Sequence, residues 1–154
     1  MKLDYYDLPF GAQILLWTSR VLINGSCRSV PNKYELVDLA YKKIGIVTGL
    51  ILLKDFLYLI KSEDSFTLQS ICERELIDNE INLINCIENN KYNDSNNHYY
   101  VKFWNISDKL SEFSKAAGKI SKEFNKFNLN TNINTISTEN LINRNKLLIN
   151  NTLH

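Results

Sequence analysis

The sequence predicts an all-α fold, a compact bundle of five to six helices around a central apolar helix at residues 46–60. This stretch is the most continuously apolar part of the chain, and only Thr48, Lys54 and Asp55 give it a polar edge. A helix that is apolar on nearly every other side must be enclosed by its neighbours. Hydrophobic residues make up 44% of the 154 residues, enough for one core.

The first two helices are indicated by their ends as well as by their spacing. The first opens at Leu8-Pro9, because proline is tolerated in the first turn, and it ends at Asn24-Gly25. A second, shorter helix runs from an N-cap at Asn32 to about Lys43. The apolar stripe of the first helix recurs at spacings of four, three and four: Phe10, Ile14, Trp17 and Val21.

The middle of the chain predicts a crossing segment and then a fourth helix. Residues 66–71 largely alternate apolar with polar, which is typical of extended backbone, and no partner strand is apparent. We therefore expect an extended crossing loop. Asp78 is expected to cap the next helix, whose buried stripe is formed by isoleucines 81, 84 and 87.

The last two predicted helices differ in how clearly the sequence pattern indicates them. Residues 98–104 are rich in aromatic side chains and are interpreted as a short helix, whereas residues 108–127, capped by Ser107, form the cleanest amphipathic pattern in the chain. From Asn128 the periodicity is lost. The prediction is a single helical domain at 1–127 and an Asn-rich tail at 128–154, mobile or folding on binding.

Composition and charge describe an ordinary globular protein. The net charge is +1 and charged residues make up 23%, which fits neither a polyanion binder nor an acidic tail. Three cysteines without a secretory leader predict reduced thiols and a cytoplasmic location. Lys54 and Asp55 lie within the apolar stretch, so we expect no membrane span, since ions are costly in hydrocarbon.

The leading functional hypothesis is a non-enzymatic protein-interaction or regulatory module that binds another protein or itself. Leu16 and Ile23 lie off the main stripe of the first helix and are candidates for an exposed apolar contact surface. No phosphate-binding loop or nucleophile motif occurs in the sequence, so an enzyme is not favoured and no cofactor is expected. The cysteine and histidine spacings match no zinc signature, so no metal site is expected either.

A row of four lysines on the last helix offers an alternative. Their spacing of four, three and four places them on one face: Lys115, Lys119, Lys122 and Lys126. Such a row is able to bind nucleic acid, but Asp108, Glu112 and Glu123 lie on or beside it and leave only a small excess of positive charge. A solvated helix face is the favoured interpretation, and a nucleic-acid-associated regulator is the alternative function.

A weaker alternative rests on the aromatic residues of the short fifth helix. His98, Tyr99, Phe103 and Trp104 together could receive a flat ligand by stacking, as a small-ligand binder or an enzyme would. Aromatic side chains at helical spacing more often pack in a core, and Tyr99 with Phe103 is an ordinary i, i+4 pair. Core packing is therefore favoured.

Two segments resemble a known group of sequences. Leu8–Trp17, followed by an arginine, and Cys72 with Asp78–Ile84 are similar to small uncharacterised helical proteins of alpha-class proteobacteria. The resemblance covers Leu8–Phe127 in outline and implies a compact all-helical bacterial protein. It implies no activity, cofactor or catalytic residue, and the Asn-rich tail departs from it.

Overall fold

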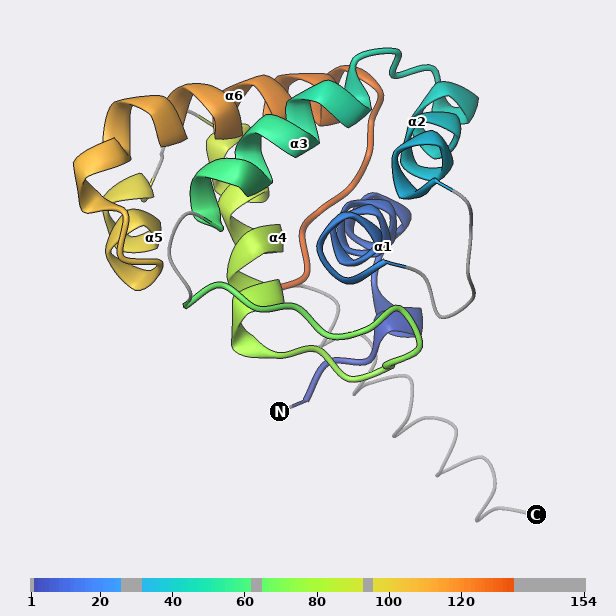
Figure 1. Ribbon diagram of the computed structural model, residues 1–154, viewed down its shortest axis with the longest axis horizontal. Helices are drawn as coiled ribbons and strands as arrows, with labels where there is room; N and C mark the ends of the chain where they lie inside the picture. Colours follow the sequence, from blue (N-terminus) through green and yellow to red (C-terminus); the bar gives the residue numbers. More distant parts are fainter. Residues whose placement is uncertain (1, 26–31, 62–64, 93–95, 135–154) are drawn as a thin grey trace, which may run out of the picture.

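The computed structural model describes residues 2–25, 32–61, 65–92 and 96–134, and within these ranges the chain is all-helical (Figure 1). Its fold class is therefore the predicted one, and no β-strand occurs in the described ranges. In chain order the elements are η1 (Tyr5–Asp7), α1 (Phe10–Asn24), α2 (Lys33–Ile44), α3 (Gly49–Ile60), α4 (Asp78–Asn90), α5 (Asn97–Phe103), η2 (Ser107–Lys109) and α6 (Leu110–Lys126), where η denotes a short 3-10 helix.

Both ends of α2 form as the sequence predicts. The side chain of Asn32 accepts a hydrogen bond from the backbone N–H of Tyr34, which satisfies one of the free donors of the first turn. Gly45 ends the helix with φ of +103°, a left-handed conformation that costs glycine little. Local signals are sufficient here because each cap involves residues next to one another in the sequence.

Two predicted N-caps are wrong. Ile77 rather than Asp78 caps α4, and the Glu80 carboxylate accepts the backbone N–H of Ile77 at 3.1 Å. Ser107 does not cap α6, because it lies in η2 and α6 begins at Leu110. The carboxylate of Glu80 acts as the acceptor at the start of α4, and a 3-10 turn precedes the start of α6.

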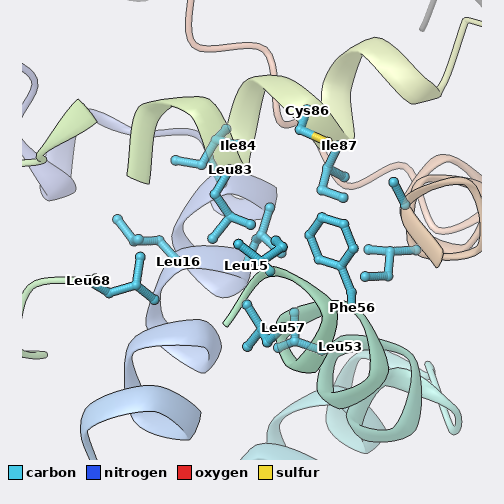
Figure 2. Close-up of a cluster of buried hydrophobic side chains, with 14 of the residues drawn as sticks. Leu15, Leu16, Leu53, Phe56, Leu57, Leu68, Leu83, Ile84, Cys86 and Ile87 are labelled. Atoms are coloured by element: carbon cyan, nitrogen blue, oxygen red, sulfur yellow. The ribbon is translucent and has the colours of Figure 1, made fainter. Parts of the chain in front are cut away.

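The core lies where α3 meets α1, α4 and α6 (Figure 2). Leu53, Phe56, Leu57 and Ile60 of α3 are buried, and the ring centroid of Phe56 lies 5.3 Å from that of Phe113 on α6. From α1 and α4 the same core receives side chains that Figure 2 labels: Leu15, Leu16, Leu83, Ile84, Cys86 and Ile87.

Residues 65–77, between α3 and α4, form no helix, in agreement with the predicted crossing loop, and a buried ion pair fixes this segment. Arg20 of α1 donates to both carboxylate oxygens of Glu80 at the start of α4, at 2.6 and 3.0 Å, with both side chains at most 1% exposed. Arg20 also donates to the backbone carbonyl of Glu73 at 2.7 Å, and Gln69 N–H donates to Glu80. This ion pair therefore joins α1, α4 and the crossing segment.

The packed domain extends seven residues beyond the predicted boundary at Phe127. Leu129, Thr131 and Ile133 are buried, and the segment that carries them runs along the molecule next to α1 (Figure 1). Ala12 N–H donates to the carbonyl of Asn130 at 3.0 Å. Residues 128–134 are thus part of the domain. Residues 135–154, with the rest of the predicted tail, lie outside the described residues.

The cysteines correct one further prediction. Cys86 is a buried free thiol, and burial raises its pKa, so it behaves as a small apolar side chain. Cys72 is disulfide-bonded, which contradicts the prediction of reduced thiols for that residue. Disulfides are typical of oxidising compartments, so the predicted cytoplasmic location loses this support and stays a prediction.

Candidate interaction surface

The apolar residues expected to be exposed on α1 are not available for contacts. Leu16 is fully buried and points into the core that Figure 2 shows. Ile23 is partly buried and packs against the same core. The predicted contact surface on α1 is therefore wrong. The side of α1 that carries Leu16 and Ile23 was predicted to be exposed, but α4 and the crossing segment cover it.

The row of four lysines on α6 is exposed, as its spacing predicts. Lys115, Lys119, Lys122 and Lys126 all project to solvent, opposite the buried side of α6. Glu112 is exposed on the first turn of the helix and Glu123 is half-buried. No lysine of this row enters an ion pair within the described parts of the chain.

The structure divides the aromatic residues of α5 and its C-cap into an inner and an outer pair. Trp104 is fully buried, its ring stacks on Tyr100 at 5.9 Å, and its Nε1–H donates to Asn79. Tyr99 and Phe103 are 49% and 38% exposed and stack on one another, and His98 is exposed. The residue best suited to hold a flat ligand is therefore committed to the core.

An exposed apolar row on α3 is the feature that the sequence prediction missed. Val47, just before the helix, and Ile51 and Tyr58 within it are 70%, 63% and 79% exposed. Ile51 and Tyr58 are seven residues apart, so they lie on one side of α3, opposite its buried side, and Val47 lies in the turn four residues before Ile51. We call these three residues the α3 row. The prediction that the central helix is enclosed except at Thr48, Lys54 and Asp55 is thus incomplete.

The α3 row has a positively charged neighbour on the side of α2. The Nζ atom of Lys54 lies 4.8 Å from the centroid of the Tyr34 ring, a cation–π contact that joins α3 to the start of α2. Tyr34 itself is 41% exposed. The apolar surface therefore continues across the contact from α3 to α2, with Lys54 held between them.

On its other side the α3 row borders a shallow groove of about 200 Å³ between α3 and α6. We call it the α3–α6 groove; its lining residues are Leu52, Asp55, Ser111, Glu112, Lys115, Ala116 and Lys119. Asp55 lines it from α3, whereas Glu112, Lys115 and Lys119 line it from α6, together with the apolar side chains of Leu52 and Ala116. Two of the predicted lysines thus belong to this groove, whereas Lys122 and Lys126 lie beyond its lining.

The two helices of the groove run in opposite directions, because the start of α3 lies at the end of α6. Ile46 and Gly49 share a small cavity with Glu123 and Phe124, whereas Asp55 faces the first half of α6. Figure 1 shows α3 and α6 extending alongside each other on one side of the molecule. The groove is therefore an elongated depression that follows both helix axes.

The described residues offer no group suited to a metal ion, and none of the helices described is long and apolar enough to cross a bilayer. No protein-family model, curated protein or solved structure matches the chain. The resemblance to small helical proteins of alpha-class proteobacteria stays a prediction.

Proposed function

We propose that the protein is an interaction module that binds another protein through the α3 row. The observation that carries this proposal is the exposure of Ile51 and Tyr58 on the side of α3 opposite the core, with Val47 exposed just before the helix. Single exposed apolar residues are ordinary on soluble proteins, but contiguous ones are typical of binding surfaces.

The energetic reason is that covering this row removes apolar surface from water. Burying a valine, isoleucine or aromatic side chain contributes about 1.5–3 kcal/mol each, so three of them supply a substantial part of a micromolar affinity. Tyrosine is also among the residues that most often dominate binding energies, because its ring is large and has few rotatable bonds. Tyr58, the most exposed of the three, is therefore the expected anchor.

Nucleic-acid binding by the row of lysines receives less support. Asp55 and Glu112 line the same groove as Lys115 and Lys119, and carboxylates repel the phosphate backbone. A lysine row also leaves the exposed α3 row without a role. Protein binding accounts for both the apolar and the charged residues of this side of the molecule.

Site-specific photo-crosslinking in cells that produce the protein tests the proposal. A photoreactive phenylalanine analogue replaces Tyr58 in one variant and Phe10, which is 59% exposed on α1, in a control variant. We expect discrete cross-linked protein products from position 58, absent from position 10 and lost when Ile51→Asp is added. Equal products from both positions, or none from position 58, would contradict the proposal.

A further inference from the structure

We propose that the α3 row and the α3–α6 groove together bind an acidic amphipathic helix of a partner protein. This inference rests on the proposed function and narrows the class of partner. The partner helix would lay its apolar side on Val47, Ile51 and Tyr58 and place acidic side chains against Lys54 on one edge and Lys115 and Lys119 on the other. Binding of an amphipathic helix by a groove between two helices is a recurrent mode of recognition.

The shape of the surface fits a helix. α3 and α6 are antiparallel neighbours, and the depression between two such helices accepts the side chains of a third. The residues of the α3 row are separated by four and then by seven positions, so the row is as long as the distance from i to i+11 on a partner helix. Apolar side chains at i, i+4, i+7 and i+11 lie on one side of such a helix and would cover the row. Leu52 and Ala116 on the groove floor extend the apolar contact toward α6.

The charge of the surface favours an acidic partner. α3 and α6 carry five lysines and three acidic residues, an excess of two positive charges, although the whole chain has a net charge of only +1. None of these five lysines is in an ion pair within the described ranges. Lysines that form no internal ion pair are available to a partner, and complementary charge raises both the association rate and the specificity.

Two other occupants from the same chain fit less well. A second copy would bring two positively charged surfaces together, which is unfavourable. Residues 135–154 contain Glu139 against Arg144 and Lys146, so their net charge has the same sign as the surface. Neither offers the net negative charge that would complement Lys54, Lys115 and Lys119.

Extended polyanions also fit less well, because Asp55 and Glu112 lie in the groove between the α3 row and Lys115. A membrane or a nucleic acid presents a regular array of phosphates and cannot avoid these two carboxylates. A helix places each charge individually, with acids opposite the lysines and neutral polar residues opposite Asp55 and Glu112. Selective placement therefore favours a helical peptide.

The test is selection from a displayed library of helical peptides on the immobilised full-length protein. Each peptide has fixed apolar residues at i, i+4, i+7 and i+11, and its flanking positions vary among Glu, Gln and Lys. We expect the selected peptides to be enriched in Glu at the flanks. A synthetic selected peptide should bind about tenfold more weakly to the Ile51→Asp variant and several-fold more weakly to Lys115→Glu/Lys119→Glu, and equally to Phe10→Asp.

Several results would overturn the inference. They are enrichment of Lys at the flanks, equal binding of a selected peptide to the unaltered protein and the Ile51→Asp variant, and selection that enriches no peptide on the unaltered protein beyond its enrichment on that variant. Ile51-dependent binding to vesicles of three parts phosphatidylcholine to one part phosphatidylserine, without Glu enrichment, would also overturn it and identify a lipid surface. All substituted residues are exposed, so an unchanged melting temperature confirms that each variant is folded.

The two proposals fail separately. Cross-linking from position 58 to a protein, combined with Lys-rich or neutral selected peptides, would leave the interaction module standing and remove the acidic helix. A cross-linked product of twice the chain mass would also remove the acidic helix, because the partner would then be a second copy. Absence of any cross-linked protein would remove both.

Discussion

Two regions of the molecule depart from the usual distribution of side chains, and they do so in opposite ways. One is the contact between α1 and α4, and the other is the outer side of α3. Between α1 and α4 the two charged residues Arg20 and Glu80 are completely buried. On the outer side of α3 the apolar residues Ile51 and Tyr58 are mostly exposed. Charges are normally outside and large apolar groups inside, so each region requires a specific reason.

The reasons differ. A buried ion pair adds little net stability over apolar residues of the same size, but it fixes geometry, because every other arrangement leaves a charge without a partner. Here the pair also holds the crossing segment through Glu73 and Gln69. The α3 row has no such internal partners, so its reason lies outside the described chain. The α1–α4 contact stabilises the fold, whereas the α3 row is the surface that we propose binds a partner.

The largest expected effect comes from breaking the buried pair. Glu80→Ala leaves the Arg20 guanidinium buried without its carboxylate and frees the N–H groups of Gln69 and Ile77. We expect the free energy of unfolding to fall by about 3–5 kcal/mol, measured by urea denaturation. The control is Glu75→Ala, which removes an exposed ion pair with Lys2 and should cost less than about 1 kcal/mol. Equal losses would show that the two pairs do not differ.

A second test uses high pH, because buried tyrosines lose their protons reluctantly. Burial raises the pKa of Tyr100 to about 12, and it also raises the pKa of Tyr41, whose hydroxyl pairs with that of Thr18. In the folded protein both tyrosines have a pKa above the value near 10 that tyrosine has in an unfolded chain. The contribution of the two protonated hydroxyl groups to stability is therefore fully present below pH 10 and is lost as the pH rises through the folded pKa values.

Stability should therefore decrease by about 1.4 kcal/mol per pH unit for each of these two groups above pH 10. Urea denaturation at pH 9, 10 and 11 measures the slope, and absorbance of the tyrosinate ion measures how many tyrosines have ionised at each pH. Tyr100→Phe should reduce the slope. A slope that Tyr100→Phe leaves unchanged would show that this hydroxyl does not control the alkaline transition.

A third test compares two glycines, one beside the C-terminal segment and one in an open position. A Cβ atom at Gly11 would overlap the carbonyl oxygen of Asn130, whereas one at Gly118 meets nothing within 4 Å. We expect Gly11→Ala to lower the free energy of unfolding by about 1–3 kcal/mol through overpacking. Gly118→Ala should raise it by about 0.5–1 kcal/mol, because alanine favours the helix. Thermal denaturation of both variants checks the difference in sign.

The smallest expected effect belongs to the α3 row. Ile51→Asp and Tyr58→Asp replace side chains that are mostly in water, so each should change the free energy of unfolding by less than about 0.5 kcal/mol. The measurement is the same urea denaturation used for Glu80→Ala. A loss of several kcal/mol would mean that the row supports the fold, and the contrast between the two regions would disappear.

Sequence reasoning predicted the helices because their apolar spacing is a local property. It could not predict the pair of Arg20 and Glu80, which lie 60 residues apart and are joined only by the fold. The signal for residues 128–134 was present, however. Leu129, Thr131 and Ile133 alternate with more exposed neighbours, which is the period of an extended segment rather than of a helix.

The candidate surface was harder to predict than the fold. A helical wheel of α3 shows which side is polar, but not how much of the apolar remainder the neighbouring helices cover. α6 covers the side with Leu53 and Phe56 and leaves Ile51 in solvent. The lysines of the groove were found because charges at helical spacing are visible in the sequence, whereas their opposite partners, Asp55 and Leu52, come from a distant helix.

The contact of Ala12 with Asn130 also has a consequence for protein synthesis. Ala12 is made early, and the carbonyl that its N–H requires is made about 120 residues later. Joining such distant points costs roughly 4 kcal/mol of loop-closure entropy. The N-terminal helix of a growing chain therefore stays partly uncovered on the ribosome until residues 129–133 have emerged. Only a chain that has been translated past this point can complete the fold.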